Sequence, residues 1–144
     1  MATYSAASEK NLDRALLLLR LVLAAIFIVH GYQKVFGMGM SGVTGMFTQI
    51  GVPAPAIMAP LISVIELVGG IALLFGAFTR VAAFLIACDM LGAIVLVHAK
   101  NGFLAPKGVE VPLGDLAMLV TVALLGAGAY SIDALLARRG STTP

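Results

Sequence analysis

Charged residues and cysteines are both scarce in this chain of 144 residues. Asp, Glu, Lys and Arg make up 11% of the sequence, whereas hydrophobic residues make up 60%; soluble domains carry about 25% charged residues. Cys88 is the only cysteine, so an internal disulfide and a cysteine-pair metal site are both excluded. The net charge is +2 without any basic run, which argues against nucleic acid as a partner. This composition indicates a single membrane domain with little mass outside the bilayer.

Several motifs of catalysis and anchoring are also missing. The glycines at 37, 39 and 42 match a dinucleotide-binding fingerprint in letters, but they follow an apolar helix rather than a strand. There is no tight pair of metal-binding histidines, so we expect no metal site. The sequence also shows no Ser-His-Asp pattern typical of nucleophilic catalysis. The pair His30 and His98 gives no convincing haem pattern. No lipidation motif is present at either end.

Four apolar segments dominate what remains. They cover residues 12–36, 56–76, 80–99 and 113–130. Each has about 20 residues, and about 1.5 Å per residue covers the ~30 Å hydrocarbon core of a bilayer. The sequence therefore predicts an all-α protein, a four-helix transmembrane bundle with up-down-up-down topology. A cleaved signal peptide is the alternative for the first segment, but that segment is long enough to span.

The remaining segments divide the chain simply. We expect a polar N-terminus at 1–11, the four-helix domain at 12–135 and a C-terminal tail at 136–144. The Gly- and Pro-rich connection at 37–55 is long and partly apolar, so it is predicted to fold back onto the membrane or to cap the bundle.

The distribution of Lys and Arg predicts the orientation. Four crossings place both termini and the middle turn on one side, which then holds six of these residues against three on the other. Because basic residues favour the cytoplasmic side, we expect both termini in the cytoplasm and a multi-pass protein of a bacterial or archaeal cytoplasmic (inner) membrane.

Ionisable side chains within the predicted spans are the strongest functional signal. A charge at bilayer depth costs roughly 2.5–3.5 kcal/mol on insertion scales, so such residues usually meet a partner, a proton or a ligand. Helical rise places Glu66 and Asp89 near the midplane and His30 slightly nearer the outer side. Small residues three and four positions from Glu66, namely Ser63, Gly69 and Gly70, leave room for close approach of another helix or a ligand. The candidate residues are Arg20, His30, Lys34, Glu66 and Asp89.

Simpler interpretations exist for some of these groups. Lys34 and Arg20 could extend to the membrane surfaces as anchors, and Glu66 could form a purely structural ion pair with Arg20, Lys34 or His30. Asp115 is interpreted as a charge favoured at a helix start, and His98 as a solvated residue.

Several segments in order resemble the DoxX family of small four-helix membrane proteins. The resemblance covers about residues 15–135 and is carried by Leu19-Arg20-Leu21, Phe27, His30–Lys34, Glu66–Leu74, Gly76–Arg80 and Gly126–Asp133. It implies an integral protein of the cytoplasmic membrane, linked in some members to a thiosulfate:quinone oxidoreductase and in others to oxidative or quinone stress. The positions that match the family pattern are His30, Lys34, Glu66, Thr79, Arg80 and Asp133.

Together these observations lead to two hypotheses. In the first, the chain is a membrane accessory subunit of a quinone-linked redox system: His30 and Lys34 polarise a quinone carbonyl, Glu66 exchanges a proton with it, and Asp89 and Arg20 complete the ligand site. In the second, the charges are ion pairs that fix helix register, and the chain is a structural or assembly subunit of a larger membrane complex. Lipid, protein partners and further copies of the chain are the expected contacts. The sequence indicates no self-contained enzyme, and transport is less favoured because no inverted repeat is visible.

Overall fold

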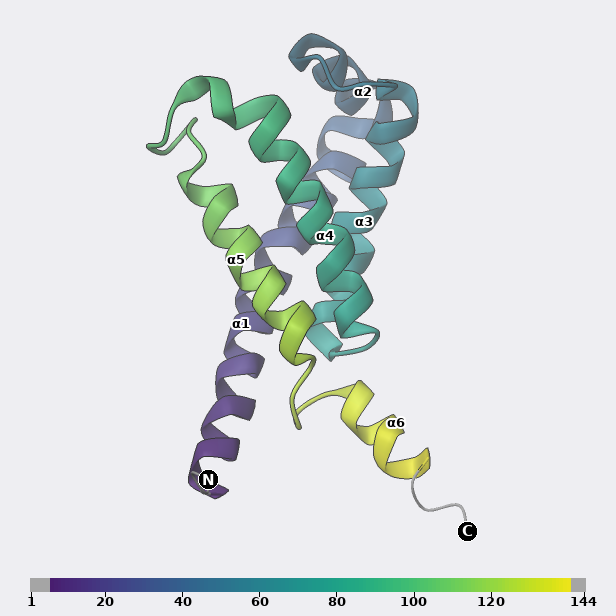
Figure 1. The fold of residues 1–144 in the computed structure, drawn as a ribbon. Coiled ribbons are helices and arrows are strands. Elements are labelled where there is room, and N and C mark those ends of the chain that lie inside the picture. Colours follow the sequence, from purple (N-terminus) through teal and green to yellow (C-terminus); the bar gives the residue numbers. More distant parts are fainter. Residues whose placement is uncertain (1–5, 141–144) are drawn as a thin grey trace.

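Helices account for all the regular structure in the computed structural model, which describes residues 6–140 (Figure 1). The all-α class predicted from the sequence is confirmed. Six α-helices are present in this part of the chain, two of which are extended by π-helical turns (η1 and η2) and one 3₁₀ turn (η3). Their bounds are α1 Ala6–Tyr32, η1 Gln33–Met38, α2 Gly39–Ile50, α3 Pro55–Phe75, α4 Thr79–Ala93, η2 Ile94–His98, η3 Ala99–Asn101, α5 Glu110–Leu125 and α6 Ile132–Gly140.

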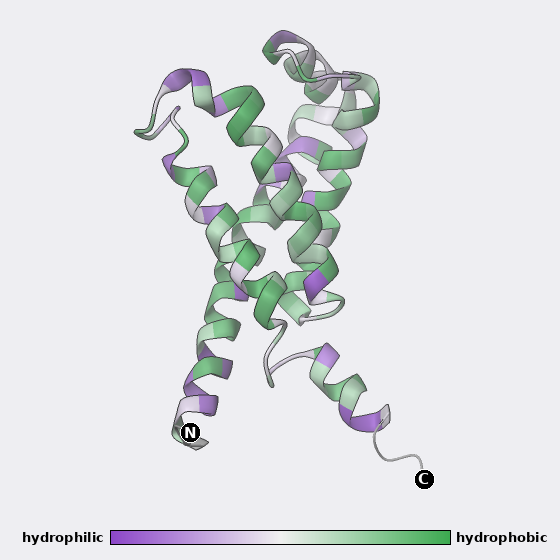
Figure 2. Cartoon of the chain, in the orientation of Figure 1, coloured by the Kyte–Doolittle hydropathy of each residue, from purple (hydrophilic) through white to green (hydrophobic). Residues whose placement is uncertain are grey.

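The four long helices pack into a closed ring of neighbours. Helix α1 lies against α3, α3 against α4, α4 against α5, and α5 against α1. Within residues 6–140, two helical segments are long and apolar enough to cross a membrane, Pro55–Phe75 and Thr79–Asn101. Hydrophobic residues dominate the middle of the molecule, and hydrophilic ones gather at the first turns of α1, at the end of α6 and near the far loops (Figure 2).

A cluster of buried apolar residues fills the centre of this ring. All four long helices contribute fully buried side chains to it, among them Phe27, Leu73, Ile86 and Leu119. Helices α1 and α3 approach most closely. A Cβ atom added at Gly70 would lie 2.8 Å from the backbone nitrogen of Ile28, so the small residue predicted to allow close helix approach has that role.

The end of the bundle that holds the start of α1 and all of α6 is densely braced. Arg20 is almost fully buried, and its guanidinium donates hydrogen bonds to carbonyls of Leu73 at 3.0 Å and Ala127 at 2.5 Å. Asp133 accepts hydrogen bonds from the backbone nitrogens of Phe78 at 2.8 Å and Thr79 at 3.0 Å. These contacts join α1, α3, α4 and the α5–α6 connection.

Three segments differ from the sequence predictions. The predicted polar N-terminus at 1–11 is already helical from Ala6. Asp13 accepts a hydrogen bond from the backbone nitrogen of Ala129 at 2.8 Å, which ties the base of α1 to the α5–α6 connection. The connection at 37–55 contains α2, since Val43 and Phe47 bury an apolar stripe against Ala59. The predicted tail at 136–144 begins within α6. Residues 1–5 and 141–144 of the predicted terminal segments lie outside the described residues.

The last long helix is shorter than predicted. The expected span at 113–130 is replaced by α5, which ends at Leu125. Gly126 and Gly128 have φ values of +88° and +73°, in the region that favours glycine, and they turn the chain away from the helix axis. The residues that follow bind Arg20 and Asp13 through their backbone, which explains why the chain leaves the helix here.

Candidate functional site

Immediately above the apolar core lies one ionisable residue from each of the four long helices. On α1, His30 follows core residue Phe27 by one turn. On α5, which runs antiparallel to α1, Asp115 precedes core residue Leu119 by one turn. Residues one turn apart occupy the same helix face, so both side chains stand at the level just beyond the core.

The other two helices contribute at the same level. Glu66 precedes the buried Gly70 of α3 by one turn, and Asp89 follows core residue Ile86 of α4 by three positions. We call His30, Glu66, Asp89 and Asp115 the polar ring. The ring therefore forms the boundary between the apolar core and the end of the molecule opposite the termini.

Beyond the polar ring, the helices diverge around a cavity of about 840 Å³. The upper half of α4 leans away from α3 and towards α5 (Figure 1). All four members of the ring line this cavity, together with Lys34 and His98. Its walls are otherwise mainly apolar, with side chains of α2, α3 and η2 such as Phe47, Ile62 and Leu96.

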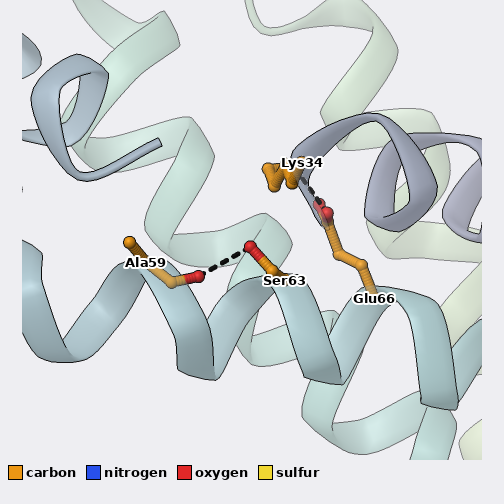
Figure 3. A network of polar contacts seen from close by, with 4 residues as sticks. All are labelled: Lys34, Ala59, Ser63 and Glu66. Carbon is orange, nitrogen blue, oxygen red and sulfur yellow. Dashed lines mark hydrogen bonds and ion pairs between the residues drawn. The ribbon is translucent and has the colours of Figure 1, made fainter. Parts of the chain in front are cut away.

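An ion pair between Lys34 and Glu66 links η1 to α3 within the cavity wall (Figure 3). Glu66 is buried and Lys34 is half-buried. One turn along α3, the Ser63 hydroxyl donates to the carbonyl of Ala59 at 2.7 Å, so it does not compete for Glu66. Glu66 therefore points towards the polar cluster rather than towards lipid.

Asp89 brings a second carboxylate to this cluster. It lies within electrostatic range of both Glu66 and Lys34. Its Oδ2 atom is buried and, among the residues that the structure describes, has no hydrogen-bond partner. Two carboxylates thus face one ammonium group, an arrangement that can hold a proton or receive a hydrogen bond from a ligand.

His30 lies four residues before Lys34 and lines the same cavity. Its ring packs edge-on against Phe27, with centroids 6.5 Å apart and an interplanar angle of 88°. The imidazole itself is exposed to the cavity. Asp115 of α5 is buried and lies within electrostatic range of it.

The structure separates Arg20 from the other predicted ligand-binding residues. His30, Lys34, Glu66 and Asp89 line one cavity, whereas Arg20 is not part of its lining. Arg20 binds carbonyls at the braced end, and these contacts include Leu73 and Ala127. The candidate residues predicted from the sequence are therefore divided between two ends of the bundle.

Two residues that line the cavity were missed at the level of sequence. Asp115 was interpreted as a helix-start charge and His98 as solvated. Asp115, Leu119 and Val122 share one helix face and are all buried, and this spacing is a signal that could have placed Asp115 towards the core. His98 carries no comparable pattern; its Nδ1 lies 2.7 Å from the carbonyl oxygen of Lys107.

The described residues contain no group of three or more His, Cys, Asp or Glu side chains with the geometry to hold a metal ion. The chemistry available at the site is that of hydrogen bonding and proton exchange. Lys34 has three donor positions, and Glu66 occupies only part of them. The remaining donors can reach a polar group of a molecule bound in the cavity.

Comparison with known families supports the resemblance seen in the sequence. The family model described as DoxX matches residues 15–99. The chain belongs to the DoxX family. Members of known sequence include an uncharacterized membrane protein of Mycobacterium tuberculosis, 36% identical over 134 residues, which cover 85% of this chain and 82% of the relative.

Two further DoxX relatives are informative. Inner membrane protein YqjF of Escherichia coli is 33% identical over 136 residues, which cover 91% of this chain and 98% of the relative. A Bacillus subtilis protein named "Putative oxidoreductase CatD" is 40% identical over 96 residues, 67% of this chain and 69% of the relative. The names of the Mycobacterium tuberculosis and Escherichia coli relatives agree with the composition in placing the chain in a membrane. No solved structure matches this DoxX protein significantly.

Proposed function

We propose that the cavity binds the head group of a lipophilic ligand of the quinone type, and that the protein acts as an accessory subunit of a membrane redox system. The observation that carries this proposal is the polar ring at the base of a mainly apolar cavity of about 840 Å³. Ligand sites commonly combine apolar walls with a few convergent polar groups. The relative that carries oxidoreductase in its name supports the redox assignment.

Each residue has a defined task in this proposal. Lys34 and His30 donate hydrogen bonds to a carbonyl oxygen of the ligand. Glu66 and Asp89 exchange a proton with it, because two carboxylates beside one ammonium can share a proton. The electrons come from, or pass to, a partner redox protein, which is why the chain is proposed as a subunit.

The test combines extraction with binding measurements. Purified protein in nanodiscs is extracted with solvent and analysed for quinone, then titrated calorimetrically with ubiquinone-1. The variant Lys34→Met/Glu66→Gln removes both members of the ion pair together, so neither is left as an unpaired buried charge. Because a charge-assisted hydrogen bond is worth about 1.5–3 kcal/mol, we expect its affinity for ubiquinone-1 to fall about tenfold or more.

Glu9→Gln is the matched control, because Glu9 is exposed near the start of α1, far from the cavity. It should bind as tightly as wild type. Absence of quinone from the extract together with equal affinity of the double variant and wild type would contradict the proposal.

A structural or assembly role is the second candidate, favoured by the ion pair that links α1 and η1 to α3. In that case Lys34→Met alone lowers the melting temperature, the double variant restores it, and no ligand is found. The partner would then be another membrane subunit or a further copy of this chain, whose association co-purification measures.

A further inference from the structure

The proposed ligand chemistry gives a role to only one of two members of the polar ring, His30 and Asp115. His30 is assigned as a donor, whereas Asp115 has no part in that chemistry. Asp115 is buried, with 6% of its surface exposed, although it is a carboxylate in an apolar helix. A buried acid in this environment needs a partner.

Core packing places Asp115 and His30 at the same level of the bundle. Phe27 and Leu119 belong to the same buried cluster, and α1 contacts α5. Because the two helices are antiparallel, the turn after Phe27 and the turn before Leu119 lie on the same side of the core. His30 and Asp115 are the residues reached by those turns, and both line the cavity.

The other cationic groups of the cavity are engaged elsewhere. Lys34 is paired with Glu66 and lies in electrostatic range of Asp89, on the side formed by α1, α3 and α4. His98 contacts the carbonyl oxygen of Lys107 through Nδ1. Asp115, by contrast, lines the same cavity as His30 and lies within electrostatic range of it.

We propose that Asp115 is a positioning residue: through a hydrogen bond, direct or bridged by a water, it holds the proton of His30 on the ring nitrogen nearer to it and thereby directs the other ring nitrogen towards the ligand. A carboxylate bonded to one nitrogen fixes both the tautomer and the orientation of an imidazole. The edge contact with Phe27 restrains the same ring from the side of the core. The inference deepens the proposed function, on which the role of His30 as a ligand donor rests, but the His30–Asp115 pair is measurable without any ligand.

The chain suits a direct spectroscopic test because it contains only two histidines. Protein labelled with ¹⁵N-histidine in nanodiscs gives two sets of imidazole signals, and His98→Gln assigns the set of His30. At alkaline pH, where neutral imidazole predominates, the nitrogen shifts report which nitrogen carries the proton. We expect His30 in wild type to be one tautomer by about tenfold, since 1.4 kcal/mol of hydrogen bonding gives that ratio.

The variant Asp115→Leu should bring the two tautomers of His30 to comparable populations, and Asp115→Glu should restore the single tautomer. Glu9→Gln should leave the His30 signals unchanged. Circular dichroism first establishes that each variant retains the wild-type helix content and melting temperature to within a few degrees. Should Asp115→Leu be poorly folded, Asp115→Ala supplies the same reading, because Ala also lacks a hydrogen-bond acceptor. A tautomer ratio that is the same in wild type and in the folded variant would overturn the inference.

Binding of ubiquinone-1 then separates this inference from the proposed function. If both hold, Asp115→Leu weakens binding as much as His30→Gln does, and the double variant is no weaker than either. A single wild-type tautomer lost in Asp115→Leu, without binding of ubiquinone-1, upholds the pair and rejects the ligand. Normal binding with the tautomer unaffected by Asp115→Leu upholds the ligand and rejects the pair.

Discussion

Asp133 shows how one carboxylate holds the start of a helix that lacks a side-chain cap. Phe78 occupies the N-cap position of α4 in a left-handed conformation, with φ of +48°, and its side chain makes no capping hydrogen bond. Asp133 supplies the missing acceptors from α6. Burial raises the pKa of Asp133, but the hydrogen bonds from Thr79 and Phe78 and the charge of Arg20 outweigh it, so that the pKa lies below its usual value.

The depressed pKa of Asp133 predicts an acid-dependent loss of stability. The stabilisation is complete above the usual Asp pKa of about 3.9, and it is lost as the pH falls through the lower pKa of the folded state. Asp133→Asn should therefore melt below wild type at pH 7, by a gap that narrows as the pH approaches 3. Melting followed by circular dichroism measures this gap, with Glu9→Gln as the control. A gap equal at both pH values would show that the carboxylate charge has no such role.

The sequence distinguishes residue roles at this scale only in part. Helical depth identified Glu66 as a buried acid that needs a partner, and the structure provides Lys34. Its position within a predicted span also marked Arg20 as a charged residue that needs a partner. The partners of Arg20 are carbonyls at the ends of other segments. Those carbonyls become available only where α3 ends and where the chain turns after α5. Such positions depend on tertiary structure, so sequence periodicity could not supply them.

At the scale of elements, the contact between α1 and α3 depends on two glycines. A Cβ atom at Gly31 would lie 2.5 Å from the backbone nitrogen of Leu67, and one at Gly70 would lie 3.2 Å from the carbonyl carbon of Phe27. Each glycine faces the other helix, so the two backbones approach closely at the level of the polar ring and again nearer the core. Small residues permit this kind of approach in membrane helices.

Gly70→Ala should force α1 and α3 apart. Overpacking of this kind costs about 1–3 kcal/mol, so the melting temperature in detergent should fall by several degrees. Gly114→Ala is the matched control, because an added Cβ at Gly114 meets no atom within 4 Å and a helical Gly-to-Ala change gains up to about 1 kcal/mol. Equal melting temperatures for the two variants would mean that the close contact contributes little.

The positions of the long helices could be predicted from apolar length, but their outer ends could not. Helices α1 and α4 each continue as a π-helix, and η1 carries Lys34 while η2 ends at His98. A π-helical turn has one extra residue per hydrogen-bonded turn and often occurs at functional sites. It changes which face later residues occupy, so a count at 100° per residue cannot place side chains beyond it.

At the scale of the whole molecule, we propose that all four long helices cross the membrane with both termini in the cytoplasm. The start of α1 and the whole of α6 lie at the same end (Figure 1), as an even number of crossings requires. The basic side chains of Arg14, Arg80 and Arg138 belong to helix segments at that end.

Reporter fusions at the C-terminus test this topology. A fluorescent protein that folds only in the cytoplasm should be bright there, and alkaline phosphatase should be inactive. The same reporters placed in the loop after Asn101 should give the opposite result. Phosphatase activity at the C-terminus would reverse the orientation while leaving the helix packing as described.

The contrast between the two ends of the bundle has a mechanical consequence. Hydrogen bonds of Arg20 and Asp133 fasten the end near the termini, whereas the opposite ends of α3 and α4 line the two sides of the cavity. Small shifts of the helices near the polar ring should then become larger displacements at the outer ends of α3 and α4. A neighbouring protein bound at those outer ends would respond to a ligand in the cavity, and one bound at the end near the termini would not.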